Sequence, residues 1–218
     1  MFDHWIKCVA IKGVKQMKLR SFPGALNISP SLFACHLLAD LRVSGLGFTG
    51  IPTGFQGFLH LKECYLRFTN VPDDRLQQLI SLCPILQKLG LSYCYQLMDL
   101  KICSSSLKFI AVNFLPVASF TVDCPQLTEL KVFKCHDLHK LELNSRALLQ
   151  HPHSLKVPSF ERHGAVKLLK KLSIVDYRVS HCLILHGIFP ELEELDVAAI
   201  VIQDMTLDQM VPRQELTT

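Results

Sequence analysis

The sequence predicts a single α/β domain in which short parallel strands stack coil upon coil. Three observations support this fold class: a leucine motif that returns along most of the chain, connecting segments that change from helical to β-like, and a globular composition. Apolar residues make up 49% and charged residues 19% of the 218 residues, as in folded domains. This length is sufficient for one domain with a sizeable core.

The repeat is clearest where one segment of the chain resembles a later one. Residues 83–94 (CPILQKLGLSYC) align with residues 124–135 (CPQLTELKVFKC). The first contains the unit Leu-x-x-Leu-x-Leu-x-x-Cys/Asn, and the second has Val132 at the third leucine position. The spacing of the unit along the chain falls within the range of about 20–29 residues for leucine-rich repeats. Copies of the unit, some substituted, start at Val14, Leu38, Leu61, Leu86, Leu107, Leu127, Leu169 and Leu192, with room for a degenerate copy near Leu148 or Leu149.

The motif predicts which side chains are buried. Side chains alternate along a strand, so the two leucines of Leu-x-Leu point to one side and the middle residue to the other. The leucines of neighbouring coils then fill one interior, in which Leu89 and Leu130 are expected to be buried. The predicted fold is a leucine-rich-repeat right-handed solenoid with a parallel β-sheet on the concave face and few helices on the convex side.

The convex side is predicted to change in structure along the chain. Residues 72–83 predict a helix, in which Asp73 or Asp74 caps the first turn. Its apolar stripe consists of Leu76, Leu79, Ile80 and Cys83. Later links are too short for helices and carry half-period copies of the motif at 97–102, 117–122 and 138–143. These copies predict strands or extended turns, so the middle of the solenoid is expected to contain few helices.

The two ends of the repeat region differ from its centre. Residues 1–13 predict an N-terminal capping helix, with Asp3 as its cap and Gly13 ending it. The inward side chains of this helix are expected to be Phe2, Ile6 and Val9. Prolines and histidines interrupt the period over residues 144–166, where an irregular loop is expected. The predicted domain covers residues 1–202, and the polar segment 203–218 is expected to be a frayed tail.

The opening segment and the Cys-Pro repeats resemble a known family. In residues 3–19 (DHWIKCVAIKGVKQMKL) a short helix leads through Gly-Val-Lys into the first strand, as in the repeat domain of plant F-box/leucine-rich-repeat proteins. Residues 31–35 (SLFAC), 55–61 (FQGFLHL) and 79–86 (LISLCPIL) are similar to the same family. The similarity extends over most of the chain.

The resemblance implies a protein-binding module like the substrate-recognition part of a plant F-box protein in a cullin-type ubiquitin ligase. Family members carry an F-box before the repeats, and that box binds the adaptor of the ligase. No Leu-Pro-x-Asp-like box precedes Asp3 in this sequence, so the adaptor is expected as a partner only if an F-box lies upstream. The alternative is a free-standing interaction scaffold that binds a protein partner without a link to the ligase.

The best candidate binding surface is the outward face of the concave sheet. Its middle positions are Lys18, Arg42, Tyr65, Gly90, Ala111, Lys131, Ser173 and Asp196, and the next outward positions are Arg20, Ser44, Arg67, Ser92, Asn113, Phe133 and Val175. The N-terminal strands gather basic side chains around Tyr65, which predicts a patch for an acidic or phosphorylated protein segment. Ordinary solvated strand residues are the alternative. Phe109 and Phe133 also face outward as candidate anchors, unless a shifted register buries them.

Other residue patterns give weaker indications of chemistry. Cys94 and Cys135 occupy a repeat position that points inward and are expected to be structural. Two His/Cys clusters, at residues 135–139 and 181–186, lack the second pair of ligands that zinc requires, so no metal and no cofactor is expected. Catalytic motifs such as Gly-x-Ser-x-Gly or His-Glu-x-x-His are absent from the sequence, and the chain is not expected to be an enzyme.

Charge, hydropathy and cysteine content narrow the expected environment. The net charge is +4 with neutral His, and no dense basic cluster indicates a nucleic acid as partner. No apolar stretch approaches the length of a bilayer span, and the first residues include Asp3, His4 and Lys7 rather than a secretory signal. Nine cysteines without a Cys-x-x-Cys pair favour free thiols and a cytoplasmic or nuclear location.

Overall fold

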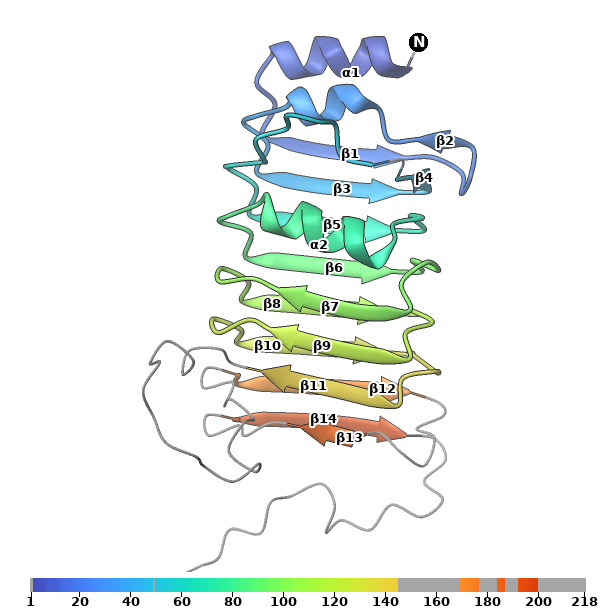
Figure 1. The fold of residues 1–218 in the computed structure, drawn as a ribbon, viewed down its shortest axis with the longest axis vertical. Coiled ribbons are helices and arrows are strands. Elements are labelled where there is room, and N and C mark those ends of the chain that lie inside the picture. Colours follow the sequence, from blue (N-terminus) through green and yellow to red (C-terminus); the bar gives the residue numbers. More distant parts are fainter. Residues whose placement is uncertain (1, 49, 145–168, 177–183, 187–191, 200–218) are drawn as a thin grey trace, which may run out of the picture.

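The computed structural model describes residues 2–48, 50–144, 169–176, 184–186 and 192–199. Within them a long parallel sheet and a short parallel sheet lie on opposite sides of the stacked coils (Figure 1). The long sheet contains, in spatial order, β1 (Gln16–Arg20), β3 (Asp40–Ser44), β5 (Glu63–Arg67), β6 (Lys88–Ser92), β8 (Phe109–Asn113), β10 (Glu129–Phe133), β12 (Lys171–Asp176) and β14 (Glu194–Ala199). Each strand begins two residues after a predicted start of the repeat, so the phasing and the α/β solenoid are confirmed.

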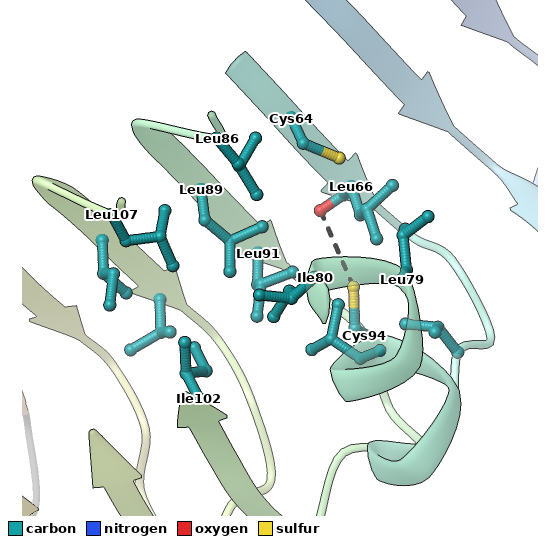
Figure 2. Packing of buried hydrophobic residues seen from close by; sticks show 14 of the residues in the cluster. Cys64, Leu66, Leu79, Ile80, Leu86, Leu89, Leu91, Cys94, Ile102 and Leu107 are labelled. Atoms are coloured by element: carbon teal, nitrogen blue, oxygen red, sulfur yellow. Dashed lines mark hydrogen bonds between the residues drawn. The ribbon is translucent and has the colours of Figure 1, made fainter. Parts of the chain in front are cut away.

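The leucines of the motif lie in the core, as their alternation predicted. Leu89 is 1% exposed and Leu130 is fully buried. In-register pairing places Ile110 between them on the intervening strand, so equivalent side chains of successive coils line one apolar interior. Figure 2 shows Leu89 and Leu91 directed into this interior, with Ile80 beside Leu91.

The short sheet confirms the strands predicted at 97–102, 117–122 and 138–143 and adds a fourth strand, at 184–186, that was not predicted. It contains, in spatial order, β13 (Ile184–His186), β11 (Lys140–Asn144), β9 (Ser119–Asp123) and β7 (Asp99–Cys103). Leu100, Phe120 and Leu141 pair in register along it and are buried against the long sheet. A separate pair of two-residue strands, β2 (Leu26–Asn27) and β4 (Leu46–Gly47), connects the first two coils.

Helix α2 (Asp73–Ser81) covers the core next to β7, before the short sheet begins (Figure 1). The predicted stripe of Leu76, Leu79, Ile80 and Cys83 is buried. The side-chain amide of Gln77 accepts from the N–H of Cys103 at 3.0 Å and donates to its carbonyl at 3.1 Å. The Gln77 side chain therefore bonds both backbone groups of Cys103 at the edge of β7, as a neighbouring strand would.

The predicted capping of α2 by an aspartate is wrong. The residue before the helix is Pro72, which makes no side-chain capping bond, and Asp73 is already the first helical residue. Its Oδ2 atom accepts instead from the backbone N–H groups of Met98 and Asp99, at 3.2 and 3.3 Å. Asp73 therefore bonds the start of β7, while its position in the first turn remains favourable for a negative charge.

Helix α1 (Phe2–Ile11) packs against the short 3-10 helix η1 (Pro30–Ala34) at the N-terminal end of the stack (Figure 1). Ile6 is fully buried, and Val9 is partly buried against the same core. Gly13 has a φ of +64° just after the helix, as its predicted terminating role requires.

Asp3 does not cap α1, contrary to the prediction, because the helix already begins at Phe2. The Asp3 carboxylate accepts hydrogen bonds from the hydroxyls of Ser29 and Ser31 and pairs with Lys7 at 2.9 Å. These three bonds hold the pKa of Asp3 well below its usual range. Asp3 therefore connects α1 to the segment that starts η1. The hydrogen bond between Asp3 and Ser29 joins residues that are 26 positions apart in the sequence.

Some predictions fall on parts of the chain outside the described residues. They include the irregular loop over 144–166, except Asn144, which ends β11, and the degenerate repeat near Leu148 or Leu149. The boundary after residue 202 and the tail 203–218 also lie outside. Among the described residues, no helix is both long enough and apolar enough to cross a membrane.

Candidate functional site

Three rows of side chains face away from the core on the long sheet. The middle row is Lys18, Arg42, Tyr65, Gly90, Ala111, Lys131, Ser173 and Asp196, and the last row begins Arg20, Ser44, Arg67, Ser92, Asn113, Phe133 and Val175, both in the predicted register. A first row precedes them on the same strands: Gln16, Asp40, Glu63, Lys88, Phe109, Glu129, Lys171 and Glu194. Together they form a polar surface with aromatic residues among the charges.

Acidic residues of the first row pair with many of the cations. Arg42 contacts Asp40 at 3.1 Å and Glu63 at 3.5 Å, and Lys88 contacts Glu63 at 2.9 Å. The C-terminal strands repeat this arrangement in the pairs Lys131–Glu129 (2.8 Å) and Lys171–Glu194 (2.7 Å). These acids were not predicted from the sequence, because the predicted surface included only two outward positions of each strand. Extending the alternation by two residues toward the strand start would have found them.

Arg42 and Tyr65 are brought together, as the predicted patch requires. The guanidinium carbon of Arg42 lies 4.6 Å from the centroid of the Tyr65 ring, and the hydrogen bond to Asp40 raises the pKa of Arg42. The ring extends over Gly90, where a Cβ atom would lie only 2.4 Å from Tyr65 Cδ1. The missing side chain at Gly90 therefore makes room for the ring, and Arg42 reaches the patch with its charge already paired.

The remaining basic residues of the patch are Lys18, Arg20 and Arg67, which are exposed and form no ion pair within the described part of the chain. In the last row, Arg20 and Arg67 flank Ser44, and Ser92 lies beyond Arg67. The available positive charge thus lies along the last row and at Lys18, rather than at Arg42. An acidic segment would meet guanidinium groups and hydroxyl donors in that row.

The predicted aromatic anchors lie on the C-terminal half of the surface. Phe133 is 37% exposed, Phe109 is half-buried, and the buried neighbours Ile110 and Val132 exclude the shifted register. The ammonium of Lys131 lies 5.6 Å from the centroid of the Phe109 ring. The predicted residues therefore form two groups on the long sheet, separated by β6, rather than one continuous patch.

The cysteines at the inward repeat position are structural, as predicted. Cys94 is fully buried, and its thiol lies 3.6 Å from the carbonyl of Leu66 (Figure 2). The carbonyl of Ser92 lies at the same distance and shares the single S–H donor. Burial raises the pKa of Cys94 to about 11. Cys135 is also buried and donates to the carbonyl of Phe133 at 3.7 Å. A neutral, enclosed thiol of this kind is a poor nucleophile.

The His/Cys clusters give no metal site in the part of the structure that can be described. No group of three or more His, Cys, Asp or Glu side chains converges there in an arrangement suited to a metal ion. In the first cluster Cys135 is buried, whereas His136 and His139 are exposed. Residues 181–183 of the second cluster lie outside the described residues.

These features define the chain as a leucine-rich-repeat protein with a polar and aromatic outward face on its long sheet. Residues 2–157 match the family described as FBD-associated F-box protein At5g56370, LRR repeats, so the chain belongs to this family. The expected resemblance to plant F-box/leucine-rich-repeat proteins is thereby confirmed for the repeat region.

A curated relative supports the same assignment. The chain is 29% identical over 130 residues to an F-box/FBD/LRR-repeat protein, At1g13570, of Arabidopsis thaliana. The aligned segment covers 60% of this chain and 31% of that protein, so the chain matches less than a third of the relative's length. No solved structure shows a significant match.

Proposed function

We propose that this chain is a protein-recognition module whose outward surface on the long sheet binds an acidic or phosphorylated segment of a partner. The observation that carries the proposal is the last row, in which Arg20 and Arg67 lack acidic partners among the described residues and alternate with Ser44 and Ser92. On the surrounding surface Arg42, Lys88, Lys131 and Lys171 are paired with acidic residues, whereas Lys18 is not paired among the described residues. An acidic guest would therefore be directed toward this row and away from the acids of the first row.

The more specific role that we propose is substrate recognition for a cullin-type ubiquitin ligase. This role is supported by the names of the matched family and of the Arabidopsis relative, because both names include the term F-box. Contact with the ligase adaptor would require an F-box in the same protein. A free-standing scaffold without a ligase link is the second candidate, because the recognition surface itself needs no F-box.

The proposed role involves binding without turnover, in the cytoplasm or nucleus. Eight cysteines among the described residues are free thiols, most of them buried, as is usual in a reducing compartment. The outward surface is built from ion pairs, hydroxyls and aromatic rings rather than from a nucleophile beside a general base.

Site-specific photo-crosslinking in plant cells tests the recognition surface. A benzoylphenylalanine at position 44, in the last row, is compared with one at position 101, on the outer face of β7. We expect a discrete crosslinked protein from position 44 only, and its loss when Arg20 and Arg67 are both changed to Glu. Crosslinks of equal yield from both positions, or crosslinks unaffected by the double charge reversal, would contradict the proposed surface.

Adaptor binding separates the two candidate roles. The recombinant 218-residue chain is mixed with the purified ligase adaptor, as is the protein that plant cells express from the same locus. We expect the recombinant chain to show no binding, and the expressed protein to bind if it carries an F-box. An expressed protein that binds its crosslinked partner but not the adaptor would favour the scaffold.

A further inference from the structure

An aromatic ladder follows the last row at the carboxyl end of the long sheet. Phe68, Tyr93 and Phe114 occupy the position directly after β5, β6 and β8. Their rings stack in order, with centroids 4.5 and 4.6 Å apart and interplanar angles of 24° and 13°. The ammonium of Lys134, at the same position after β10, lies 4.8 Å from the centroid of the Phe114 ring.

The backbone at each step of this ladder is in the left-handed region. The φ angles are +49° at Phe68, +54° at Tyr93, +51° at Phe114 and +52° at Lys134. Glycine adopts this conformation most easily, and the equivalent position one coil earlier is Gly45, with a φ of +76°. Large aromatic residues at three such positions are unusual, and strained positions of this kind concentrate at binding sites.

A small cleft opens beside the ladder. Its volume is about 200 Å³, and it is lined by the aromatic and apolar residues Tyr93, Tyr95, Phe114, Leu115 and Pro116 and by the polar residues Lys134, His136 and Asp137. The ring of Tyr95 is 59% exposed and stands at 68° to that of Tyr93, with centroids 6.5 Å apart. A cleft below about 300 Å³ is too small for a drug-sized ligand. Its dimensions and its aromatic walls, with polar residues at Lys134, His136 and Asp137, suit one large side chain.

The electrostatics of the ladder favour an aromatic guest over a cationic one. An aromatic ring has a negative face and a positive edge. Both faces of Tyr93 are covered by its neighbours, and Lys134 covers the second face of Phe114, so these two rings offer their positive edges. A guest ring that turns its face to those edges gains the edge-to-face arrangement, whereas a guest ammonium would be repelled by those edges. The charged residues of the lining, Lys134 and Asp137, have opposite signs.

Arg67 provides the charged part of the same site. Its guanidinium carbon lies 4.9 Å from the centroid of the Phe68 ring and 5.5 Å from that of Tyr93. No acidic side chain pairs with it among the described residues. A guanidinium held against aromatic rings keeps its N–H groups in a fixed plane, which suits two-point binding of a carboxylate.

We propose that the ladder cleft receives one aromatic side chain of an extended partner segment, while Arg67 binds a nearby carboxylate of that segment. This inference rests on the proposed function and names the recognition element: an acidic residue close to a Phe, Tyr or Trp. Tyr93 contacts both Arg67 and the cleft, so the two subsites adjoin each other.

Fluorescence anisotropy with synthetic peptides tests this assignment. The probes are fluorescein-labelled Gly/Ser dodecapeptides with a Glu-Glu pair and one Trp at spacings of one to five residues. Matched peptides carry Gln for Glu, Ser for Trp, or phosphoserine for Glu. The protein variants are Tyr93→Gly, whose positive φ glycine accepts readily, Tyr95→Ser, Arg67→Gln, and Lys101→Gln on β7 as the charge-matched control.

We expect at least one Glu/Trp spacing to bind at least tenfold more tightly than both single-element peptides. The Tyr93→Gly, Tyr95→Ser and Arg67→Gln variants each lose at least tenfold affinity for it, and Lys101→Gln loses none. If Tyr93→Gly fails to fold, Tyr95→Ser still tests the cleft, because its exposed ring is outside the ladder. Tighter binding of the phosphoserine peptide, or equal binding without Trp, overturns the inference.

Failure of this inference differs from failure of the proposed function. If no peptide binds while position 44 still crosslinks a partner, recognition uses the last row without the ladder cleft. If the crosslinks also fail, the outward surface is not the recognition site.

Discussion

At the scale of single residues, the outward surface depends on where a side chain is missing as much as on where one is present. Gly90 has no Cβ, and the Tyr65 ring uses that space while Arg42 lies against the ring. The paired charges around them, from Asp40 and Glu63, leave this part of the surface nearly neutral. Shape and charge on the middle row are therefore set by residues that the leucine motif does not specify.

A double-mutant cycle tests the contact between Tyr65 and Gly90. Gly90→Ala is expected to displace the ring and to reduce the free energy of unfolding by about 1 kcal/mol, through lost ring contacts and the lost cation–π contact of Arg42. In a Tyr65→Ser background the same change should cost nothing measurable, giving a coupling of at least about 0.5 kcal/mol. Urea unfolding measures both. Equal effects of Gly90→Ala in the two backgrounds would disprove the contact.

Thiol reactivity tests the interior position of the cysteines. Burial raises the pKa of Cys94 to about 11 and that of Cys124 to about 12, whereas Cys8 is exposed. At pH 8 iodoacetamide is expected to alkylate Cys8 and to leave Cys94 and Cys124 unmodified until the protein is unfolded. Mass spectrometry of peptides from native and urea-treated protein gives the rates. Alkylation of native Cys94 at the rate of Cys8 would show that it is not enclosed.

At the scale of elements, the convex side combines a helix and strands because side chains of α2 bond the edge of the short sheet. Gln77 bonds both polar backbone groups of Cys103, and Asp73 accepts from the N–H groups of Met98, just before β7, and of Asp99, its first residue. Without them the edge of β7 would expose unpaired backbone groups. The convex side therefore changes from helix to strand where the polar side chains of Asp73 and Gln77 connect α2 to β7.

Removal of the Gln77 amide tests this connection between α2 and β7. Gln77→Leu leaves the N–H and carbonyl of Cys103 without these partners and is expected to lower the free energy of unfolding by about 1–3 kcal/mol. The matched control is Gln78→Leu, since Gln78 is exposed on the same helix and bonds only to Arg75 through its side chain. Urea midpoints provide the comparison. A similar small loss in both variants would mean that Gln77 does not hold the edge of β7.

The attachment of α1 is expected to depend on pH through Asp3. Hydrogen bonds from Ser29, Ser31 and Lys7 keep the pKa of Asp3 below its unfolded value near 3.8. Its stabilising contribution is therefore complete above that value and is lost as the pH falls toward the lowered pKa. The difference in Tm between the wild type and Asp3→Asn should be largest at pH 6 and shrink below pH 4. A difference that grows on acidification would have the wrong sign.

At the scale of the whole molecule, the leucine period predicted the strands described for the long sheet and three of those in the short sheet, but not β13. Leu89, Leu91 and Leu130 are buried where the alternation requires, because one face of every coil must contact its neighbours. The candidate site was predicted less completely. The acids of the first row needed a third outward position, and the ladder of Phe68, Tyr93 and Phe114 depends on turn conformations that the motif does not encode.

The division of the long sheet into a core face and an outward face is tested most directly by single substitutions at neighbouring residues of the same strand. Leu89→Ala and Leu130→Ala remove buried side chains, whereas Lys88→Ala and Lys131→Ala change exposed neighbours on the same strands. Urea unfolding should show losses of about 2–5 kcal/mol for each leucine and less than about 1 kcal/mol for each lysine. Losses below about 1 kcal/mol at both leucines, or equal losses within each pair, would contradict the division into an apolar core face and an outward recognition face.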